Sequence, residues 1–262
     1  MTEIILGFAV VGAIGLVAGI LLSISSKAFY VEVDERVSKI RECLPGANCG
    51  ACGFAGCDEY AKALVENNAK TNLCTPGADA VAAQICGILG VEATDVIEMK
   101  AVVHCNGNCE ATSKDFDYKG IPTCSAASMV FGGPNACKYG CLGCGDCANV
   151  CPVNAICIKD GIAHIDSRVC IGCGLCAKTC PKDIISMVPQ MATVEVLCSS
   201  KDKGAVARKK CKNACIGCKK CELNCPAQAI KVENNIAVID YTKCTDCGLC
   251  VENCPTKCIK KA

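Results

Sequence analysis

Cysteines dominate the chemically reactive residues of this chain: there are 30 of them among 262 residues. More than half fall into one spacing, C-x2-C-x2-C-x3-C followed by proline, which occurs four times. The four copies are Cys141, Cys144, Cys147, Cys151 with Pro152; Cys170, Cys173, Cys176, Cys180 with Pro181; Cys215, Cys218, Cys221, Cys225 with Pro226; and Cys244, Cys247, Cys250, Cys254 with Pro255. This spacing is the bacterial ferredoxin run, whose thiolates bind a [4Fe–4S] cluster. The chemistry that it predicts is electron transfer.

In two-cluster ferredoxins, the fourth cysteine of each run ligates the neighbouring cluster. Applied to this chain, the rule predicts four ligand sets, two from each pair of runs. We name them site 1A (Cys141, Cys144, Cys147 and Cys180), site 1B (Cys170, Cys173, Cys176 and Cys151), site 2A (Cys215, Cys218, Cys221 and Cys254) and site 2B (Cys244, Cys247, Cys250 and Cys225).

A fifth set has a different spacing nearer the N-terminus, Cys49-x2-Cys52-x4-Cys57-x16-Cys74, and we name it the N site. Glycines lie between these cysteines, and glycine lets the backbone approach a cluster closely. Four thiolates in so compact a unit suit one more [4Fe–4S] cluster, with a structural zinc knot as the alternative. The sequence therefore predicts at least five [4Fe–4S] clusters.

Disulfides and zinc are the competing uses for so many thiols. No cleavable signal pattern precedes the cysteines, and ligands in threes with a distant fourth do not suit paired bridges. Zinc usually takes two C-x2-C pairs, often with histidine, and this chain has only His104 and His164. The iron–sulfur interpretation requires free thiolates and therefore a reducing compartment.

Several cysteines lie outside these sets. Cys137 and Cys211 each precede a ferredoxin run by four residues, so they compete with Cys144 and Cys218 as ligands. In another interpretation, the pairs Cys124/Cys137 and Cys198/Cys211 join Cys105 or Cys109 and bind an additional group. The third interpretation is a buried thiol without a ligand role. The sequence does not decide between the three.

The second half of the chain repeats itself with a shift of 74 residues and no gap. The shift superposes both runs of the first pair on those of the second, and it pairs Cys124 with Cys198 and Cys137 with Cys211. Two tandem two-cluster modules are the direct interpretation.

Short elements between the motifs are expected to position them. Ile156–Lys159 and Ala163–Asp166 alternate as strands of a hairpin that turns at Gly161, and Asn234-Asn235 marks the matching turn in the repeat. Helices are expected over 33–44, 58–67 and 78–89.

The N-terminal segment has a different character. No charged residue occurs from Ile4 to Ser26, and this length suits one transmembrane helix. The start lacks the basic residues of a signal peptide. Lys27, Arg36, Lys39 and Arg41 follow the span. By the positive-inside rule, these basic residues predict a single-pass protein in the cell membrane with its cysteine domains on the cytoplasmic side.

The expected fold class is thus α+β: one transmembrane helix, a small helical [4Fe–4S] domain and two tandem ferredoxin-like modules. The expected boundaries are 1–26 for the anchor, 27–85 for the single-cluster domain, 86–135 for a cysteine-containing connector, and 136–197 and 198–262 for the modules.

Partners are indicated only weakly by charge, since the formal net charge is +1. Residues 201–220 are strongly basic and would either steer an acidic redox partner or form a solvated loop. The chain has neither a G-x-G-x-x-G after a strand nor a phosphate-binding loop, so nucleotide chemistry is expected on other subunits. We expect no nucleic-acid partner.

The N-terminal span, the N-site spacing and the following ferredoxin runs together resemble the B subunit of the Rnf complex (RnfB). The stretches Gly132-Gly133-Pro134 and Tyr139-Gly140-Cys141-Leu142-Gly143 are similar to that family too. The resemblance covers nearly the whole chain, although shorter members have one two-cluster module where this chain has two.

The resemblance implies a subunit of a membrane-bound ferredoxin:NAD+ oxidoreductase that couples electron flow to Na+ or H+ transport. In that family the B subunit takes electrons from reduced soluble ferredoxin and passes them to membrane subunits. The rival interpretations are a membrane-anchored polyferredoxin that serves a different oxidoreductase and a structural zinc protein.

Overall fold

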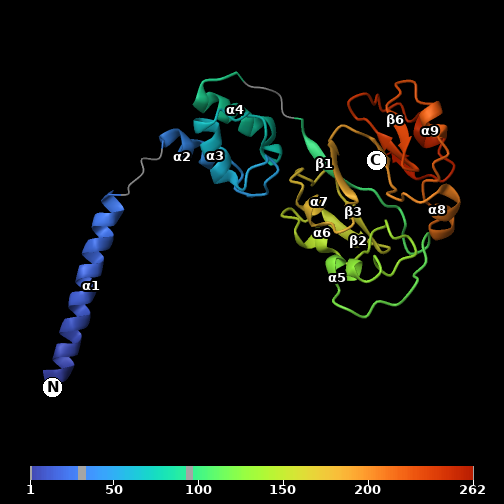
Figure 1. Ribbon diagram of the computed structural model, residues 1–262. Helices are drawn as coiled ribbons and strands as arrows, with labels where there is room; N and C mark the ends of the chain where they lie inside the picture. Colours follow the sequence, from blue (N-terminus) through green and yellow to red (C-terminus); the bar gives the residue numbers. More distant parts are fainter. Residues whose placement is uncertain (1, 29–33, 93–96, 262) are drawn as a thin grey trace.

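The computed structural model describes residues 2–28, 34–92 and 97–261, with the side chains of 2–11 and 26–28 left aside. A long helix, α1 (Thr2–Ala28), leads into a small helical domain, which is followed by two cysteine-rich α+β modules (Figure 1). The mixed α+β class with ferredoxin-like parts agrees with the expectation from the sequence.

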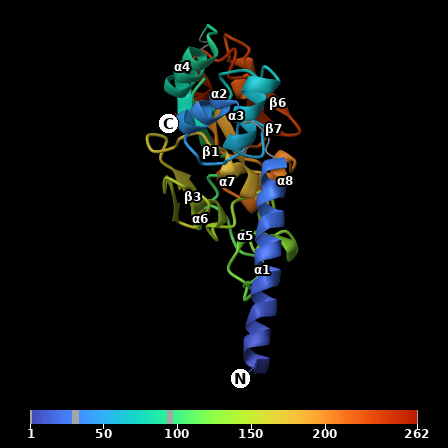
Figure 2. The same cartoon turned by 90° about the vertical axis from the view of Figure 1, so that its left-hand side faces the viewer.

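Helix α1 projects away from the other elements (Figures 1 and 2). Its described side chains, residues 12–25, are all exposed. Across the part of the chain that the structure describes, no helix combines the length and the apolar character needed to cross a membrane.

The helical domain contains three α-helices and one 3₁₀ turn. Their bounds are α2 (Glu35–Cys43), α3 (Cys57–Glu66), η1 (Thr75–Gly77) and α4 (Ala78–Leu89). The helices over 58–67 and 78–89 are confirmed, and α2 begins two residues after the predicted start at Val33, which lies outside the described residues. Their apolar faces meet in one core, where Ile40, Tyr60, Leu64 and Ile85 are each at most 2% exposed. This core fixes the loop that holds the first N-site cysteines.

The first module contains four strands and three short helices. They are β1 (Met99–Val103), α5 (Cys124–Met129), α6 (Asp146–Asn149), β2 (Ile156–Lys159), β3 (Ile162–Ile165), α7 (Leu175–Thr179) and β4 (Ile185–Pro189). Strand β1 pairs antiparallel with β4, and β2 pairs antiparallel with β3. Strand β1 thus comes from the segment expected to be a connector.

The second module repeats this arrangement. Its elements are β5 (Val194–Val196), α8 (Gly204–Lys210), α9 (Lys220–Leu223), β6 (Ile230–Glu233), β7 (Ile236–Ile239), α10 (Leu249–Glu252) and β8 (Ile259–Lys261). Strand β5 pairs with β8 and β6 with β7, both antiparallel. Both predicted hairpins are confirmed, and their turn residues Asp160, Gly161, Asn234 and Asn235 all have positive φ, as a type I′ turn requires.

The two modules are joined through buried polar contacts between β1 and the β5 region. Lys100 and Glu195 form an ion pair of 3.0 Å, with side chains 5% and 15% exposed. The ring of His104 is held between the carbonyl oxygen of Val196 at 2.7 Å and Oγ of Ser186 at 2.5 Å. His104 therefore has a structural role in fixing the segment where β1 ends.

Candidate metal centres

The N site is formed by a loop before α3 and by the cysteine that precedes η1. Burial raises the pKa of the Cys74 thiol, and the nearby thiols of Cys57, Cys49 and Cys52 raise it further. The loop is shaped by Gly50 and Gly53, both with positive φ.

The ring of Tyr60 lies next to this site. Burial raises the pKa of Tyr60 to about 12, with smaller contributions from Cys74 and Cys52. The Tyr60 hydroxyl donates to the carbonyl oxygen of Lys70 at 2.7 Å, which ties the start of α3 to the loop before Cys74. The helical core therefore holds all four thiols of the N site near one another.

Site 1A lies in the first module beside α6. Burial raises the pKa of Cys147 to about 12, and Cys141 and Cys180 are among the thiols that raise it further. Burial also raises the pKa of Cys144 to about 11, and the nearby thiol of Cys141 raises it further. The distant Cys180 thus lies near Cys141 and Cys147 of the local run.

Site 1B lies beside α7. Burial raises the pKa of Cys176 to about 11, with contributions from the thiols of Cys170, Cys173 and Cys151. Cys151 belongs to the other run, so the fourth cysteine of that run lies among the thiols of this one.

The second module has the same two groupings. Burial raises the pKa of Cys221 to about 11, and the thiols of Cys215, Cys218 and Cys254 are its neighbours.

Site 2B repeats the second grouping. Burial raises the pKa of Cys250 to about 11, and the thiols of Cys244, Cys247 and Cys225 are its neighbours. Thiols of each of the five sets are therefore neighbours in the structure, and their assignment as cluster ligands stays a prediction.

Two observations fit these groups to iron–sulfur clusters. All thirty cysteines are free thiols. Backbone N–H groups also point at ligand sulfurs: Ala155 donates to Sγ of Cys151 at 3.3 Å, and Ala229 donates to Sγ of Cys225 at 3.4 Å. Such hydrogen bonds stabilise the negative charge of a cluster and tune its reduction potential.

Cavities lie among these thiols. One cavity contacts Cys141, Cys147 and Cys180 of site 1A, and another contacts all four cysteines of site 2B, each with a volume of about 20 Å³. Within the described residues, no three His, Cys, Asp or Glu side chains have the arrangement of a site for a single metal ion.

The N site and site 1B are neighbours. Burial raises the pKa of Cys173, and the nearby thiol of Cys49 raises it further. The ammonium of Lys178 on α7 donates to the carbonyl oxygens of Cys49 at 3.2 Å and Gly50 at 3.1 Å. The cysteine loop of the helical domain is therefore attached to helix α7 of the first module.

Six of the ten remaining cysteines occupy two kinds of position. Cys124 and Cys258 each join a ferredoxin set as a fifth thiol: Cys124 lies beside Cys144, and Sγ of Cys258 is 3.7 Å from Sγ of Cys254. By contrast, Cys137, Cys211, Cys105 and Cys198 line a further cavity, which Cys141 of site 1A also borders. Cys109 is exposed and does not line this cavity. The spacing of the runs did not distinguish these two kinds of position.

The fold and these groups of thiols define an iron–sulfur protein of the polyferredoxin class, which binds multiple [4Fe–4S] clusters. Residues 44–76 match the family described as "Putative Fe-S cluster". Residues 140–184, 169–230 and 207–255 match families described as "4Fe-4S dicluster domain".

Comparison with curated proteins identifies the family. The chain is 46% identical over 246 residues to the B subunit of the proton-translocating ferredoxin:NAD(+) oxidoreductase complex of Clostridium ljungdahlii, covering 93% of this chain and 87% of that protein. It is 43% identical over 245 residues to the B subunit of the Na(+)-translocating ferredoxin:NAD(+) oxidoreductase complex of Acetobacterium woodii, covering 93% and 74%. It is 40% identical over 238 residues to the B subunit of the ion-translocating oxidoreductase complex of Methanosarcina acetivorans, covering 90% of each.

The chain belongs to the family of B subunits of ion-translocating ferredoxin:NAD+ oxidoreductase complexes. The resemblance to RnfB is thereby confirmed.

Proposed function

We propose that this chain is the electron-transfer subunit of a membrane-bound, ion-translocating ferredoxin:NAD+ oxidoreductase complex, and that it takes electrons from reduced ferredoxin and passes them to membrane subunits. The observation that carries the proposal is the sequence of contacts between sites, in which the N site lies against site 1B, and site 1B shares its runs with site 1A. Such neighbouring sites suit electron transfer from one to the next.

The twenty cysteines of sites 1A, 1B, 2A, 2B and the N site are proposed as the ligands of five [4Fe–4S] clusters. When bound, each cluster supplies a redox centre that accepts or donates one electron. The residues of the chain fix the order of the sites, shield buried thiols such as those of Cys147 and Cys221 from water, and donate backbone hydrogen bonds to ligand sulfurs.

We propose that electrons enter at the C-terminal module and leave at the N site. The basic residues 201–220 are on the C-terminal module, where Arg208, Lys209, Lys212, Lys219 and Lys220 are exposed. They would attract an acidic ferredoxin. Cys247 of site 2B is also exposed, which places a ligand of that site at the surface.

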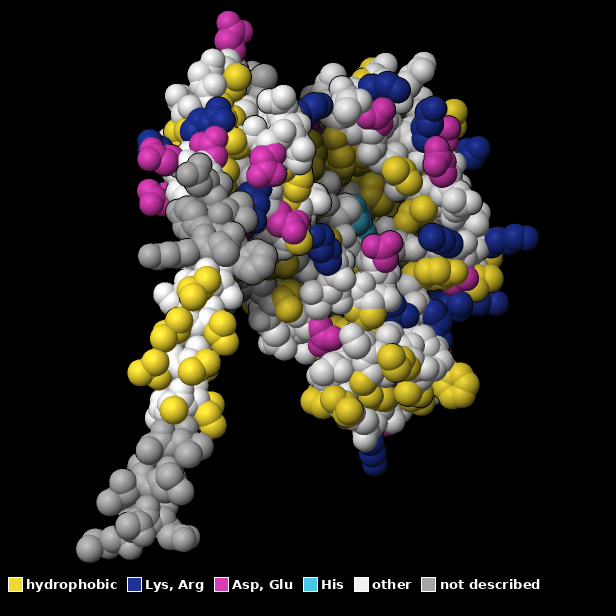
Figure 3. Space-filling view, turned by 60° about the vertical axis from the view of Figure 1, so that its left-hand side comes forward, with side chains coloured by type: hydrophobic (Ala, Val, Ile, Leu, Met, Phe, Trp, Pro, Cys, Tyr) yellow, Lys and Arg dark blue, Asp and Glu magenta, His cyan; other side chains and the backbone are white. Residues whose placement is uncertain are grey.

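The N-terminal 26 residues are proposed as a membrane anchor that keeps the N site close to the bilayer. Support comes from the uncharged run from Ile4 to Ser26 and from apolar side chains that cover the described part of α1 (Figure 3). Ile14, Leu16, Leu21 and Leu22 on this helix are each at least 60% exposed. The basic residues after the span support a single-pass topology with the clusters on the cytoplasmic side.

The test uses the intact complex with a Cys52→Ser variant and a matched Cys157→Ser control, because Cys157 is an exposed cysteine outside the five sets. Ferredoxin should still reduce the clusters of both modules in the Cys52→Ser complex, while ferredoxin-dependent NAD+ reduction stops. The control should keep full turnover. Unchanged turnover in the Cys52→Ser complex would refute the N site as the exit. Co-purification with a different oxidoreductase would favour the polyferredoxin alternative.

A further inference from the structure

We propose that Cys105, Cys137, Cys198 and Cys211 bind a sixth [4Fe–4S] cluster at the junction of the two modules. This junction site contains none of the twenty cysteines assigned to the other clusters. The proposal concerns metal content and extends the proposed function without depending on it.

The four cysteines line one cavity. Its volume is about 20 Å³, the same as that of the cavities at site 1A and site 2B. The cavity therefore has the size of those lined by ferredoxin-run cysteines.

Cys137 is the neighbour of the other three thiols. Burial raises the pKa of Cys105 to about 12 and that of Cys198 to about 11, and Cys137 adds to both shifts. Cys211, whose pKa is also raised by burial, has Cys137 as its neighbouring thiol. Cys137, Cys198 and Cys211 also pack in one apolar cluster. The four thiols thus face one buried space.

The junction site has two equivalent halves, one from each module. Cys105 lies two residues after the end of β1, and Cys198 lies two residues after the end of β5. Sγ of Cys105 accepts from the backbone N–H of Cys141 at 3.3 Å and of Gly107 at 3.4 Å.

Sγ of Cys198 accepts in the same way, from the backbone N–H of Cys215 at 3.2 Å and of Ser200 at 3.5 Å. The other two thiols, Cys137 and Cys211, are equivalent through the shift of 74 residues. Because backbone N–H groups donate to ligand sulfurs in iron–sulfur sites, both halves have the hydrogen bonds that a cluster needs.

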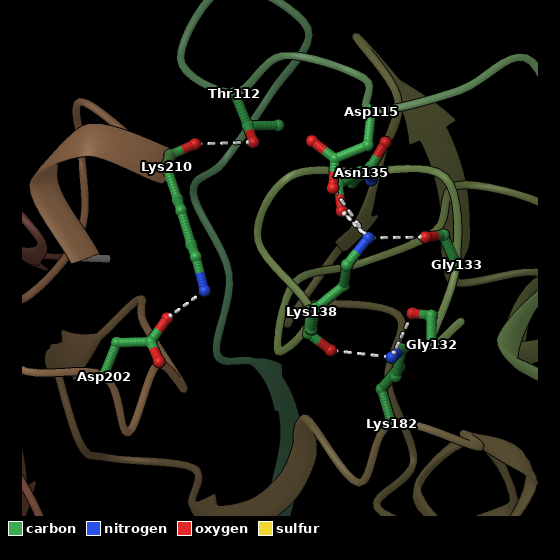
Figure 4. A network of polar contacts seen from close by, with 9 residues as sticks. All are labelled: Thr112, Asp115, Gly132, Gly133, Asn135, Lys138, Lys182, Asp202 and Lys210. Atoms are coloured by element: carbon green, nitrogen blue, oxygen red, sulfur yellow. Dashed lines mark hydrogen bonds and ion pairs between the residues drawn. The ribbon is translucent and has the colours of Figure 1, made fainter. Parts of the chain in front are cut away.

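The backbone beside the cysteines is held by polar contacts (Figure 4). Lys210, which precedes Cys211, accepts at its carbonyl oxygen from Oγ1 of Thr112 at 2.9 Å, and its ammonium contacts Asp202 at 2.8 Å. Lys138, which follows Cys137, donates to Asp115 at 2.9 Å and to the carbonyl oxygen of Gly133 at 3.1 Å. The contacts of Lys210 and Lys138 therefore hold the backbone next to Cys211 and Cys137 in place.

Small residues keep the cavity open. At Gly107, an added Cβ would lie 3.3 Å from Sγ of Cys211 and 3.6 Å from Sγ of Cys105. At Gly140, it would lie 3.6 Å from Sγ of Cys105. Because these glycines have no side chain, the space beside Sγ of Cys105 and Cys211 stays open.

The position explains what such a cluster would do. Cys105 contacts Cys141 of site 1A, and Cys198 contacts Cys215 of site 2A. The junction site therefore lies between the two modules and completes a series in the order 2B, 2A, junction site, 1A, 1B, N site.

The test measures iron, acid-labile sulfide and zinc per chain in anaerobically purified full-length protein. Six clusters predict about 24 irons and as many sulfides. A value of about 20 irons with no zinc would overturn the junction cluster while leaving the five-cluster proposal intact. One zinc per chain that disappears on substitution of the junction cysteines would also overturn it.

A variant localises the additional cluster. The Cys105→Ala/Cys198→Ala protein should lose about four irons and four sulfides relative to wild type, and the Cys109→Ala/Cys157→Ala control, with two exposed cysteines replaced, should lose none. Equal iron in the two variants would contradict the assignment. If the first variant fails to fold, the iron and sulfide content of the wild-type protein still decides between five and six clusters.

Discussion

The ammonium of Lys178 donates to the carbonyl oxygen of Cys49 at 3.2 Å, so a helix of the first ferredoxin module holds the cysteine loop of the helical domain. A second bond from the same ammonium reaches the carbonyl oxygen of Gly50 at 3.1 Å. This contact joins site 1B to the N site, which are adjacent steps in the proposed electron path.

The Lys178→Gln substitution should loosen the cysteine loop without unfolding either domain, because the contact is exposed. Loss of these bonds should lower the local opening free energy by about 1 kcal/mol. Amide hydrogen exchange of residues 49–53 in the holoprotein should then become about fivefold faster. Lys159→Gln, at an exposed lysine on β2, is the control and should leave this exchange unchanged. Unaltered exchange in both variants would show that Lys178 does not hold the loop.

Gly143 should be intolerant of any side chain, because its φ is +71° and an added Cβ would overlap the carbonyl oxygen of Gly161. Gly143→Ala should destabilise the protein by about 1–3 kcal/mol and hasten cluster loss in denaturant. Gly87→Ala is the matched control, since Gly87 lies in α4 with open space around it. That change should stabilise the protein by about 0.5–1 kcal/mol. Equal denaturation midpoints for the two variants would contradict the predicted overlap.

Replacing only one residue of the buried ion pair Lys100–Glu195 should lower the free energy of unfolding. Lys100→Met leaves the carboxylate of Glu195 buried without its partner, which should destabilise the contact between modules by about 3–5 kcal/mol. Lys100→Met/Glu195→Leu should recover most of this loss, because two apolar side chains replace the pair. Guanidinium unfolding of the holoprotein, followed by visible absorbance, measures both. A double variant no more stable than Lys100→Met would argue against a coupled pair.

The repeat made much of this structure predictable. The shift of 74 residues located both hairpins, and Gly161 and Asn234-Asn235 identified their turns. The folded modules bring Cys180 and Cys151 near the thiols of the other run, which is the proximity that the crossed ligand sets require.

The junction site could not be obtained from the same shift. The gapless alignment pairs Cys198 with Cys124, but Cys105 has the equivalent position after its strand, with equivalent hydrogen bonds. Cys124 lies instead on α5 beside Cys144. Strands β1 and β4 pair although most of the module lies between them in the sequence, and such a long-range pairing leaves no local pattern in the sequence.

The basic surface of the second module should control the rate of association with ferredoxin. Lys219→Glu/Lys220→Glu should lower the association rate by about tenfold at low ionic strength, with a smaller effect in high salt. Lys62→Glu, at an exposed lysine on α3, should have little effect. Stopped-flow reduction by ferredoxin across a series of salt concentrations measures the rates. A salt-independent rate, equal in both variants, would exclude this surface as the docking site.

The central claim is that this chain takes electrons from ferredoxin into protein-bound [4Fe–4S] clusters. The most direct measurement is anaerobic mixing of the full-length protein with reduced ferredoxin, followed by visible absorbance and by EPR. The account predicts that ferredoxin becomes oxidised while the visible absorbance of the chain bleaches and signals of interacting reduced clusters appear. A colourless protein that contains zinc and no sulfide, and that leaves ferredoxin reduced, would contradict it.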